Sequence, residues 1–493
     1  MCMCWRKDSG AACATTKRDR SKTPWNIMPS TPKNFPSFWS SPAVTDFATF
    51  ERDVYRAKTL AADSEVVNKL QSILQEPDFL TMLQVYACQN AMKYEGMRKV
   101  NIRLASGNSY AINSPLFVKA RPKDRRRSKR RKNVCFHLGL LYLGIFEHSS
   151  PTLISRALSL AALCPSFDTA CDALRLQGIK MTHTLLQHLT YKVTDCFMRD
   201  RAANVVCDHY RKPGLRILIA IDGGRLRERT QKKGPKPKAA KRKGYTTEWR
   251  EPKLFTICLI DEQGNKLKDV PPIYDGAVTG PDEIFQILTD YLRQIDYRNA
   301  DAVVFCADGG PWIWPRTEQI IKDLEIPNAH RILDYTHAKQ NLMEIANRIL
   351  QAGCVPANKY DALVSQMKDW LWNGRIDKIE QYIKDTLRGK RSKKQALKKL
   401  NDYFGDHDKF RYCDFYAAGL PTGSGAIESA IRRIINLRIK GPGIFWLLPN
   451  ADRMIFLRSQ VLSGRWLHVI RSATLSWRNT LQKPPLQSVS KAA

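Results

Sequence analysis

LRILIAID at residues 215–222 and DAVVFCAD at residues 301–308 are two apolar runs that each end in an aspartate. Their β-branched and aromatic side chains favour buried strands. LFTICLI at 254–260 predicts another strand and RILD at 331–334 a short one, while residues 285–295 have the spacing of an amphipathic helix. Strands separated by a crossover helix predict an α/β domain, with a mixed sheet and helices on its faces.

The segments on either side of this sheet are expected to be mainly helical. Residues 346–414 are polar, lack strand signals and contain the basic run KRSKKQALKK, so they predict a helical insertion before the sheet domain closes near Ser424. Toward the N-terminus, residues 50–93 have helical apolar spacing. Residues 100–112 alternate at period two around Ser-Gly-Asn, which predicts a β-hairpin.

Residues 151–195 are expected to form short helices with the rhythm of a helix-turn-helix. Ala170 is small where two helices must approach, Gly178 can supply the turn, and Thr182 can cap the second helix. The second helix would present three side chains to a DNA groove: His183, Gln187 and His188. An ordinary helical hairpin shows the same rhythm, so a hairpin without a role in DNA reading stays open as an alternative.

These patterns divide the chain into seven predicted parts. They are a disordered tail (1–50), a helical and hairpin region with a basic run (51–135), a helix-turn-helix-like DNA-binding domain (136–210), the first part of a catalytic core (211–345), a helical insertion (346–414), the closing helices of the core (415–475) and a flexible tail (476–493).

The charge and the cysteines restrict the class of protein. The formal net charge is +33 over 493 residues, which attracts polyanions, with nucleic acid as the first candidate and an anionic membrane surface as the second. No apolar run reaches the length of a membrane span, and the N-terminus lacks the core of a signal peptide, so a cytoplasmic protein without a membrane partner is expected. None of the 13 cysteines forms a Cys-x-x-Cys pair, which favours free thiols over a zinc site.

The two strand-end acids, Asp222 and Asp308, predict a metal site. If their strands are parallel neighbours, both carboxylates lie at one edge of the sheet, where ligands bind in such folds. Two adjacent carboxylates repel each other unless a cation lies between them, and Mg²⁺ prefers carboxylate and phosphate oxygens. Two glycines follow each acid, and their missing side chains are expected to leave room for substrate.

Glu428 is the third acid of the predicted site. It follows the turn Pro421-Thr422-Gly423-Ser424-Gly425, in which Ser424 can cap a helix. On a helical wheel it lies roughly 75° from the centre of the apolar stripe, so its carboxylate borders the buried face. Taken alone, Glu428 would equally suit an ordinary ion pair with Arg432, one turn further on.

The chain resembles the DDE transposases of bacterial insertion sequences, nearest the Kra-type group and more distantly the Mutator-like transposases. The resemblance covers roughly residues 100–465. It rests on four motifs: Asp222-Gly223-Gly224-Arg225, Ala307-Asp308-Gly309-Gly310-Pro311-Trp312-Ile313-Trp314, Ile332-Leu333-Asp334-Tyr335-Thr336-His337-Ala338 and Gly423-Ser424-Gly425-Ala426-Ile427-Glu428-Ser429.

This resemblance implies an RNase H-like core with a helical insertion before the glutamate, and a bacterial, nucleoid-associated protein. It implies two Mg²⁺ ions per site, for which Mn²⁺ can substitute, held by Asp222, Asp308 and Glu428 as catalytic and metal-binding residues. Asp334 and His337 look like the (Cys/Asp)-x-x-His signature of related superfamilies, as substrate-orienting or merely structural groups. Relatives often carry a cysteine-based, zinc-like module, but only Cys135 stands near its place, so no zinc is expected.

Three basic segments are expected to hold DNA phosphates, and each could instead be a solvated surface. They are Arg125, Arg126, Arg127, Lys129, Arg130 and Arg131 in the first run; Arg225, Lys232, Lys233, Lys236, Lys238, Lys241, Arg242 and Lys243 in a loop beside Asp222; and Arg432, Arg433, Arg438 and Lys440 after Glu428. Trp312 and Trp314 are expected in the core, with stacking on an unpaired base as the alternative.

The sequence therefore predicts a transposase that cleaves transposon ends and joins them to target DNA. Double-stranded DNA is the expected partner, and a homodimer or higher oligomer is expected in the DNA complex. Two alternatives stay open. The first is an RNase H-like nuclease or resolvase without strand transfer, and the second is a non-catalytic DNA-binding protein derived from a transposase.

Overall fold

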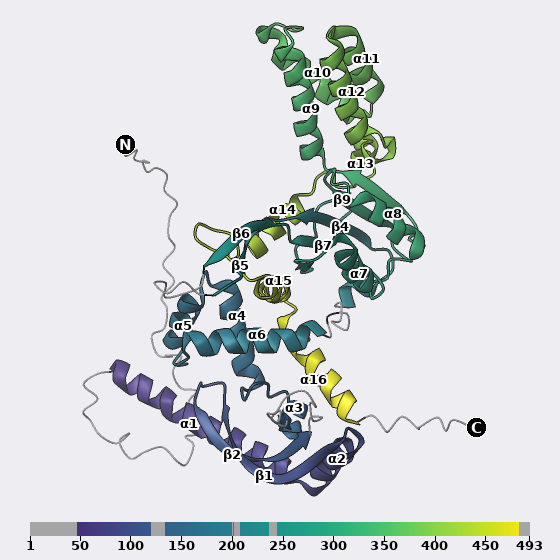
Figure 1. Cartoon of the computed structure of the whole chain (residues 1–493). Helices are drawn as coiled ribbons and strands as arrows, with labels where there is room; N and C mark the ends of the chain where they lie inside the picture. Colours follow the sequence, from purple (N-terminus) through teal and green to yellow (C-terminus); the bar gives the residue numbers. More distant parts are fainter. Residues whose placement is uncertain (1–46, 120–133, 200, 202–207, 236–243, 483–493) are drawn as a thin grey trace, which may run out of the picture. The chain divides into compact units, whose positions relative to one another are not determined.

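The computed structural model describes residues 47–119, 134–199, 201, 208–235 and 244–482 (Figure 1). The chain divides into two compact units, residues 1–62 and residues 63–493. Most of the predicted tail at 1–50, the basic run at 121–132 and the end of the tail at 476–493 lie outside the described residues. The fold that positions the candidate site belongs entirely to the second unit.

Two helices and a three-stranded sheet come first along the chain. The helices are α1 (Phe47–Gln75) and α2 (Pro77–Gln89). Strands β1 (Met92–Arg103) and β2 (Ser109–Lys119) pair in antiparallel register, and β3 (Val134–Phe136) pairs with β2. The predicted hairpin is confirmed, and its strands are longer than the stretch that alternates most clearly.

Four helices follow: α3 (Leu138–Tyr142), α4 (Pro151–Leu163), α5 (Phe167–Leu176) and α6 (His183–Arg199). A short 3₁₀ turn, η3 (Asp208–Arg211), leads to the next strand. The apolar faces of α4, α5 and α6 share one hydrophobic core with the last helices of the chain and one face of the main sheet. These helices therefore pack as part of the larger unit, because their buried side chains have no separate core.

The main sheet has five strands in the order β10-β9-β4-β7-β8, of which Figure 1 labels β9, β4 and β7. They are β4 (Arg216–Gly223), β7 (Lys253–Leu259), β8 (Ile273–Ala277), β9 (Ala302–Ala307) and β10 (Ala329–Leu333). The first three form an antiparallel trio; β9 pairs in parallel with β4, and β10 pairs in parallel with β9. The mixed α/β sheet and the strands predicted at 215–222, 254–260, 301–308 and 331–334 are confirmed.

Helices cover both faces of this sheet. Ile219 and Phe255 enter one core with α7 (Pro281–Leu292) and α8 (Trp314–Asp323), which are on one side of the strands. Ala220 and Leu254 enter the other core, with the closing helices. Adjacent residues of a strand point to opposite faces, so the continuous apolar runs of β4 and β7 supply both cores at once.

The segment between β4 and β7 is a two-stranded antiparallel ribbon. It consists of β5 (Leu226–Gln231) and β6 (Tyr245–Arg250). The sequence suggested only a loop here, because the two strands contain few apolar residues. Ladder hydrogen bonds form regardless of that composition, and nearly all of β6 is exposed.

The predicted insertion contains helices and short 3₁₀ turns. After α9 (Tyr335–Gln351) the chain forms η4 (Ala357–Lys359), α10 (Tyr360–Trp372), α11 (Ile376–Thr386), α12 (Lys390–Phe404), η5 (His407–Lys409) and α13 (Tyr412–Ala417). Their apolar sides join the core on the α7 and α8 face of the sheet. Each helix buries one stripe and leaves its charged residues outside, as amphipathic spacing predicts.

The closing helices are α14 (Gly425–Ile431), α15 (Leu448–Leu462) and α16 (Trp466–Gln482). A π-helical turn, Arg432–Asn436, continues α14. Helix α14 packs on β4 and β7, and α15 packs on β8. Within the described ranges, no helix combines the length and the apolar character needed to cross a membrane.

Candidate active site

Three aspartates stand side by side at the carboxyl ends of neighbouring parallel strands. Ile221 of β4 is opposite Ala307 of β9, so the next residues, Asp222 and Asp308, follow in register. Ala307 is also opposite Leu333 of β10, and its carbonyl accepts a hydrogen bond from the Asp334 N–H at 2.8 Å. Parallel pairing thus brings together acids that are up to 112 residues apart (334 − 222).

The environment of Asp222 favours a bound cation. Burial raises the pKa of its carboxyl to about 6; the N–H of Gly223, at 2.6 Å, opposes this rise, and the negative charge of Asp308 adds to it. The charge of His337 lowers the pKa and that of Glu251 raises it. A divalent cation would relieve the repulsion between the carboxylates and favour their ionised form.

Asp334 connects β10 to two helices through both of its oxygens. Its side chain is about 1% exposed, and its Oδ1 accepts the backbone N–H of His337 at 2.7 Å, which caps α9. Its Oδ2 accepts the N–H of Ser424, the residue that precedes α14. Burial alone would raise the pKa of Asp334, but the hydrogen bonds from Ser424 and His337 hold it below the ordinary value. The cap is local to α9, whereas the contact with Ser424 joins β10 to a distant part of the chain.

Glu428 lies on α14 and is exposed. Its carboxylate, the Asp334 carboxylate and the His337 ring offer one donor atom each, and these atoms all lie within 4.8 Å of one another. The His337 Nδ1 is 3.1 Å from Asp334 Oδ1, so the imidazole is oriented by the same carboxylate that caps its helix. Carboxylate oxygens with one imidazole nitrogen suit a divalent cation.

The structure therefore forms two neighbouring groups from the predicted site residues. Asp222 is adjacent to Asp308, and Glu428 is adjacent to Asp334 and His337. Among the described residues, the cluster within 4.8 Å does not include Asp222 or Asp308. The charge of His337 lowers the pKa of Asp222, so His337 belongs to the second group and is also near the first. In the sequence analysis, Asp334 and His337 received only a secondary role. The signal that could have placed them in the cluster is an acid at a strand end with a histidine three residues later.

The glycines after the acids do not leave open space, which corrects the expectation that they make room for substrate. A Cβ on Gly309 would lie 2.1 Å from the Tyr403 ring, and one on Gly224 would lie 2.3 Å from Ile435. These positions require glycine because other parts of the protein approach them closely. The approach at Gly309 brings α12 of the insertion next to the strand that carries Asp308.

Trp314 and Trp312 also contribute to this region. Trp314 is buried, and its Nε1 donates a hydrogen bond to the Asp308 carbonyl at 2.9 Å, which helps to fix the backbone of the acid. Trp312 is partly buried, with its ring edge-to-face with Phe285 and 5.1 Å from the Lys253 ammonium. These packed positions agree with a place in the core.

The basic residues expected to hold DNA fall into three groups. Arg225, Lys232, Lys233, Arg432 and Lys440 are exposed. Arg433 is partly buried over the Tyr274 ring, at 5.8 Å. Lys236, Lys238, Lys241, Arg242 and Lys243 lie outside the described residues, as do Arg125, Arg126, Arg127, Lys129, Arg130 and Arg131. The exposed members are accessible to a phosphate, and their contact with DNA stays a prediction.

Arg438 differs from the expected surface arginine. It is only 6% exposed, and its guanidinium lies 5.3 Å from the Phe167 ring and 5.5 Å from the Trp446 ring. Burial lowers the pKa of this group. The stacking between α5 and the segment after α14 removes Arg438 from the surface, so the expectation that it contacts DNA is corrected.

The helix-turn-helix-like segment consists of α5 and α6. Ala170 is buried between helices, Gly178 has a φ of +80°, and the Thr182 hydroxyl accepts the N–H of Leu185 at 3.3 Å. His183 and His188 are exposed, with His188 3.4 Å from Glu147, and Gln187 is partly exposed. The turn chemistry is as expected, and DNA reading by α6 stays a prediction.

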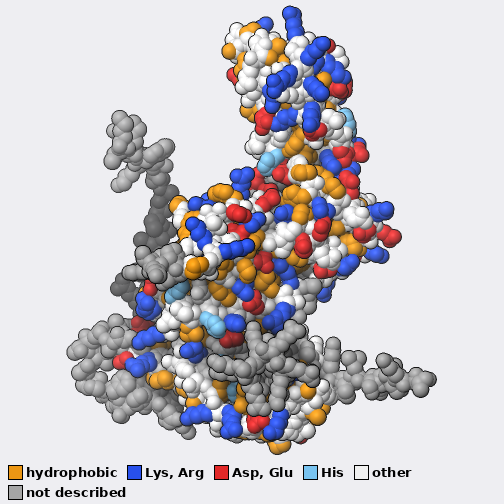
Figure 2. All heavy atoms as spheres, in the orientation of Figure 1, with side chains coloured by type: hydrophobic (Ala, Val, Ile, Leu, Met, Phe, Trp, Pro, Cys, Tyr) orange, Lys and Arg blue, Asp and Glu red, His pale blue; other side chains and the backbone are white. Residues whose placement is uncertain are grey.

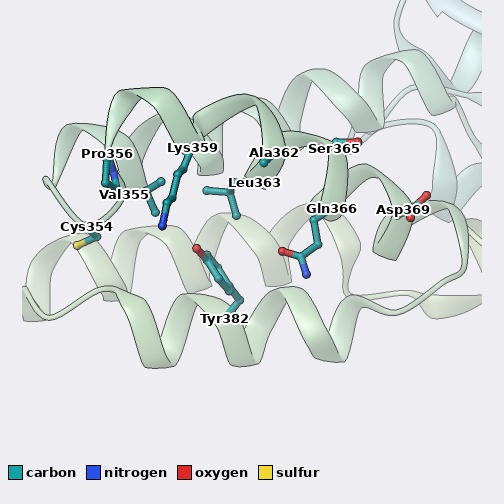
Figure 3. Close-up of a pocket in the computed structure, with 10 residues that line it drawn as sticks. All are labelled: Cys354, Val355, Pro356, Lys359, Ala362, Leu363, Ser365, Gln366, Asp369 and Tyr382. Carbon is teal, nitrogen blue, oxygen red and sulfur yellow. The ribbon is translucent and has the colours of Figure 1, made fainter.

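Other potential ligand sites are separate from the acids. The described cysteines are free thiols, and none belongs to the acidic cluster. The insertion has a pocket of about 760 Å³ (Figure 3). It is lined by Cys354, Val355, Pro356, Lys359, Ala362, Leu363, Ser365, Gln366, Asp369 and Tyr382, which all belong to α10, α11 and the turn before them. None of the candidate site residues lines it.

Comparisons with known proteins do not identify a family. No protein-family model and no curated protein matches the chain. Among solved structures, the chain is similar to the Drosophila P element transposase strand transfer complex, with 14% sequence identity and a TM-score of 0.24. The match covers 64% of this chain and 79% of that chain. A likeness of this degree decides neither fold nor function, so the function must be argued from the site itself.

Proposed function

We propose that the protein is a DNA transposase that cleaves transposon ends and joins them to target DNA with metal ions held at the sheet edge. The observation that carries the proposal is the register of β4, β9 and β10, which aligns Asp222, Asp308 and Asp334 at one edge. The motifs around these acids and Glu428 resemble those of DDE transposases. They therefore favour DNA transposition over other reactions that acids at a sheet edge could catalyse.

The proposed core is RNase H-like. It is supported by the antiparallel trio β4, β7 and β8, by the parallel strands β9 and β10 beside it, and by the helices between β10 and α14. Those helices occupy the interval in which the resemblance implies an insertion. A helix-turn-helix formed by α5 and α6 belongs to the same proposal.

The acids would hold two Mg²⁺ ions, with Mn²⁺ as a substitute. Bound ions would activate water or a 3′-hydroxyl and stabilise the leaving oxygen of the phosphodiester. Asp222 would take part in holding both ions, and its position next to Asp308 and the charge of His337 that acts on it support this role. Asp308 and Glu428 would each hold one ion, and Asp334 and His337 would orient Glu428 and the substrate.

A cleavage and joining assay tests the proposal. The protein is incubated with Mg²⁺, a target plasmid and a duplex that carries the candidate transposon end and is labelled on one strand. The expected products are a cut end and a labelled end joined to the plasmid. Nicked DNA without joined products would support a resolvase. DNA binding without any cleavage by the wild-type protein would support a non-catalytic descendant. Size measurement of the DNA complex tests the proposed dimer or higher oligomer.

A further inference from the structure

Helix α12 concentrates positive charge on the insertion. It carries six basic residues and one acid, Asp402. Ala396, Leu400 and Phe404 are buried at every fourth position and fix one side of the helix in the core. The basic residues therefore point away from that side, and Figure 2 shows lysine and arginine side chains gathered on the insertion.

Three of these lysines form one exposed row, which we name the α12 stripe: Lys390, Lys394 and Lys398. Their spacing of four residues places them on the same face, about 12 Å from end to end at about 1.5 Å per residue. The three stripe lysines line an open groove, together with Leu397 and Asn401 of the same helix and Glu380 of α11.

The stripe is not neutralised by nearby acids. Glu380 pairs with Lys384 at 2.6 Å, Lys399 pairs with Glu344, and Lys393 donates to the Lys384 carbonyl at 2.6 Å. Among the described residues, no carboxylate forms an ion pair with the three stripe lysines. Like charges four residues apart on a helix destabilise it by a few tenths of a kcal/mol per pair, so the arrangement gains stability when a polyanion binds.

Lys398 also lines a second groove, which reaches the sheet. Gly309 and Pro311 form its end next to Asp308, and α9 contributes Asn341 and Arg348. Its remaining lining residues are on α12: Gln395, Lys399, Asp402 and Tyr403. Because Lys398 lines both grooves, the two grooves together connect the α12 stripe to Gly309.

Tyr403 lies where the second groove comes close to the acids. Its ring fills the space beside Gly309. Burial raises the pKa of its hydroxyl, and the negative charges of Asp308 and Asp334 raise it further. The ring thus lies near enough to both carboxylates for their charges to act on it.

We propose that the α12 stripe binds the phosphodiester backbone of the DNA strand whose scissile phosphate lies at Asp222 and Asp308. This inference rests on the proposed function, since it takes DNA as the substrate of the acids. The 12 Å stripe matches the axial length of three to four nucleotides, at about 3.4 Å per phosphate of one strand. Contact with phosphates alone makes the binding independent of base sequence.

The test compares the triple variant Lys390→Gln, Lys394→Gln and Lys398→Gln with a matched triple variant, Lys322→Gln, Lys359→Gln and Lys378→Gln. The control lysines are exposed and lie outside both grooves. Binding of the full chain to a random-sequence duplex is measured in Ca²⁺, from about 50 to about 200 mM salt. The stripe variant should bind at least about tenfold more weakly at about 100 mM salt, with a log–log salt slope shallower by about 0.9 per lost contact.

The control variant should lose less affinity than the stripe variant. Its log–log salt slope should also stay closer to that of the wild type. Equal losses in the two triple variants would overturn the stripe as a defined surface, because they would reflect net charge alone. A wild-type slope in the stripe variant would overturn it as well. Thermal unfolding of both variants shows whether either has failed to fold, and Lys398→Gln alone, which changes one charge in both grooves, then repeats the comparison.

The outcome for Asp308→Asn separates this inference from the proposed function. If Asp308→Asn stops cleavage while the stripe variant binds as the wild type does, the proposed chemistry stands and the stripe fails. If the stripe variant loses binding while Asp308→Asn cleaves at the wild-type rate, the surface stands as a DNA-binding site and the proposed chemistry fails.

Discussion

The sheet edge and the helical insertion place opposite charges on very different supports. The acids lie at the ends of strands of the main sheet, of which β9 is completely buried and β4 is buried over its middle residues, and ladder hydrogen bonds fix these backbones. The lysines of α12 lie on an exposed helix face. Metal coordination requires donor atoms at set positions, whereas phosphate attraction requires mainly charge density. Hydrogen-bonded strand ends therefore support the groups whose geometry matters, whereas the lysines need only be exposed and close together.

The largest expected effect belongs to the strand-end acids. Asp222→Asn and Asp308→Asn should each reduce Mg²⁺-dependent cleavage by at least about a thousandfold, because each removes a proposed metal ligand that would contribute several kcal/mol in the transition state. DNA affinity should stay close to that of the wild type. Nicking rates and gel-shift titrations measure the two effects, with the exposed Asp361→Asn as control. Cleavage by either variant at the wild-type rate would remove that acid from the site.

The next largest effect is a pH dependence of the free energy of unfolding that arises from Asp222 at the sheet edge and not from the insertion. The pKa of Asp222 rises from 3.8 to about 6 on folding, so the folded state favours the protonated carboxyl. In metal-free protein its stabilising contribution is present below pH 3.8 and is lost as the pH rises through about 6. A shift of this size corresponds to at most about 3 kcal/mol.

Denaturant unfolding in a chelator, from acidic to neutral pH, measures this effect. The difference between the wild type and Asp222→Asn should change with pH across that window, because asparagine does not titrate. Added Mg²⁺ should restore stability to the wild type at neutral pH and much less to Asp222→Asn. A difference that is constant with pH would contradict the raised pKa.

A smaller effect is expected at Asp334, which joins the sheet edge to α14. The His337 and Ser424 N–H groups bond to different oxygens of Asp334, and asparagine replaces one of these oxygens with an NH₂ group, so one buried donor loses its acceptor. Asp334→Asn should therefore lower the free energy of unfolding by about 1–3 kcal/mol. It should also slow cleavage, because α14 carries Glu428.

The control for Asp334→Asn is Asp261→Asn, at an exposed turn away from the acids. The stability of both variants is measured by denaturant unfolding at saturating Mg²⁺. Asparagine caps a helix about as well as aspartate does. Unchanged stability would thus mean that the cap of α9 is the main role of this residue and that the contact with Ser424 contributes little.

The smallest effect is expected on the ribbon beside Asp222. Lys232→Gln with Lys233→Gln should weaken binding of all DNA sequences alike and flatten the log–log salt slope by about 0.9 per lost contact. Cleavage of bound DNA should keep its rate, because neither lysine belongs to the acidic cluster. An unchanged slope would show that the ribbon does not touch DNA and would leave the insertion as the stronger phosphate-binding surface.

Local patterns in the sequence predicted much of this fold. The apolar runs that end at Asp222 and Asp308 became central strands, because β-branched side chains suit a position buried on both faces. The hairpin, the helices of the insertion and the cap at Asp334 also follow from interactions between residues that are close in the chain. The two strands of the ribbon contain few apolar residues, so only their hydrogen bonds revealed the ribbon.

Tertiary structure decided which of these residues meet. The contact between Asp334 and Ser424 joins residues 90 positions apart and brings Glu428 to Asp334 and His337 rather than to Asp222. Packing of α12 placed Tyr403 against Gly309, and packing of α5 buried Arg438. Such contacts depend on how separate elements pack in space. The sequence alone therefore determined the strands and the acids at their ends, whereas the partners of those acids depended on long-range packing that no local spacing encodes.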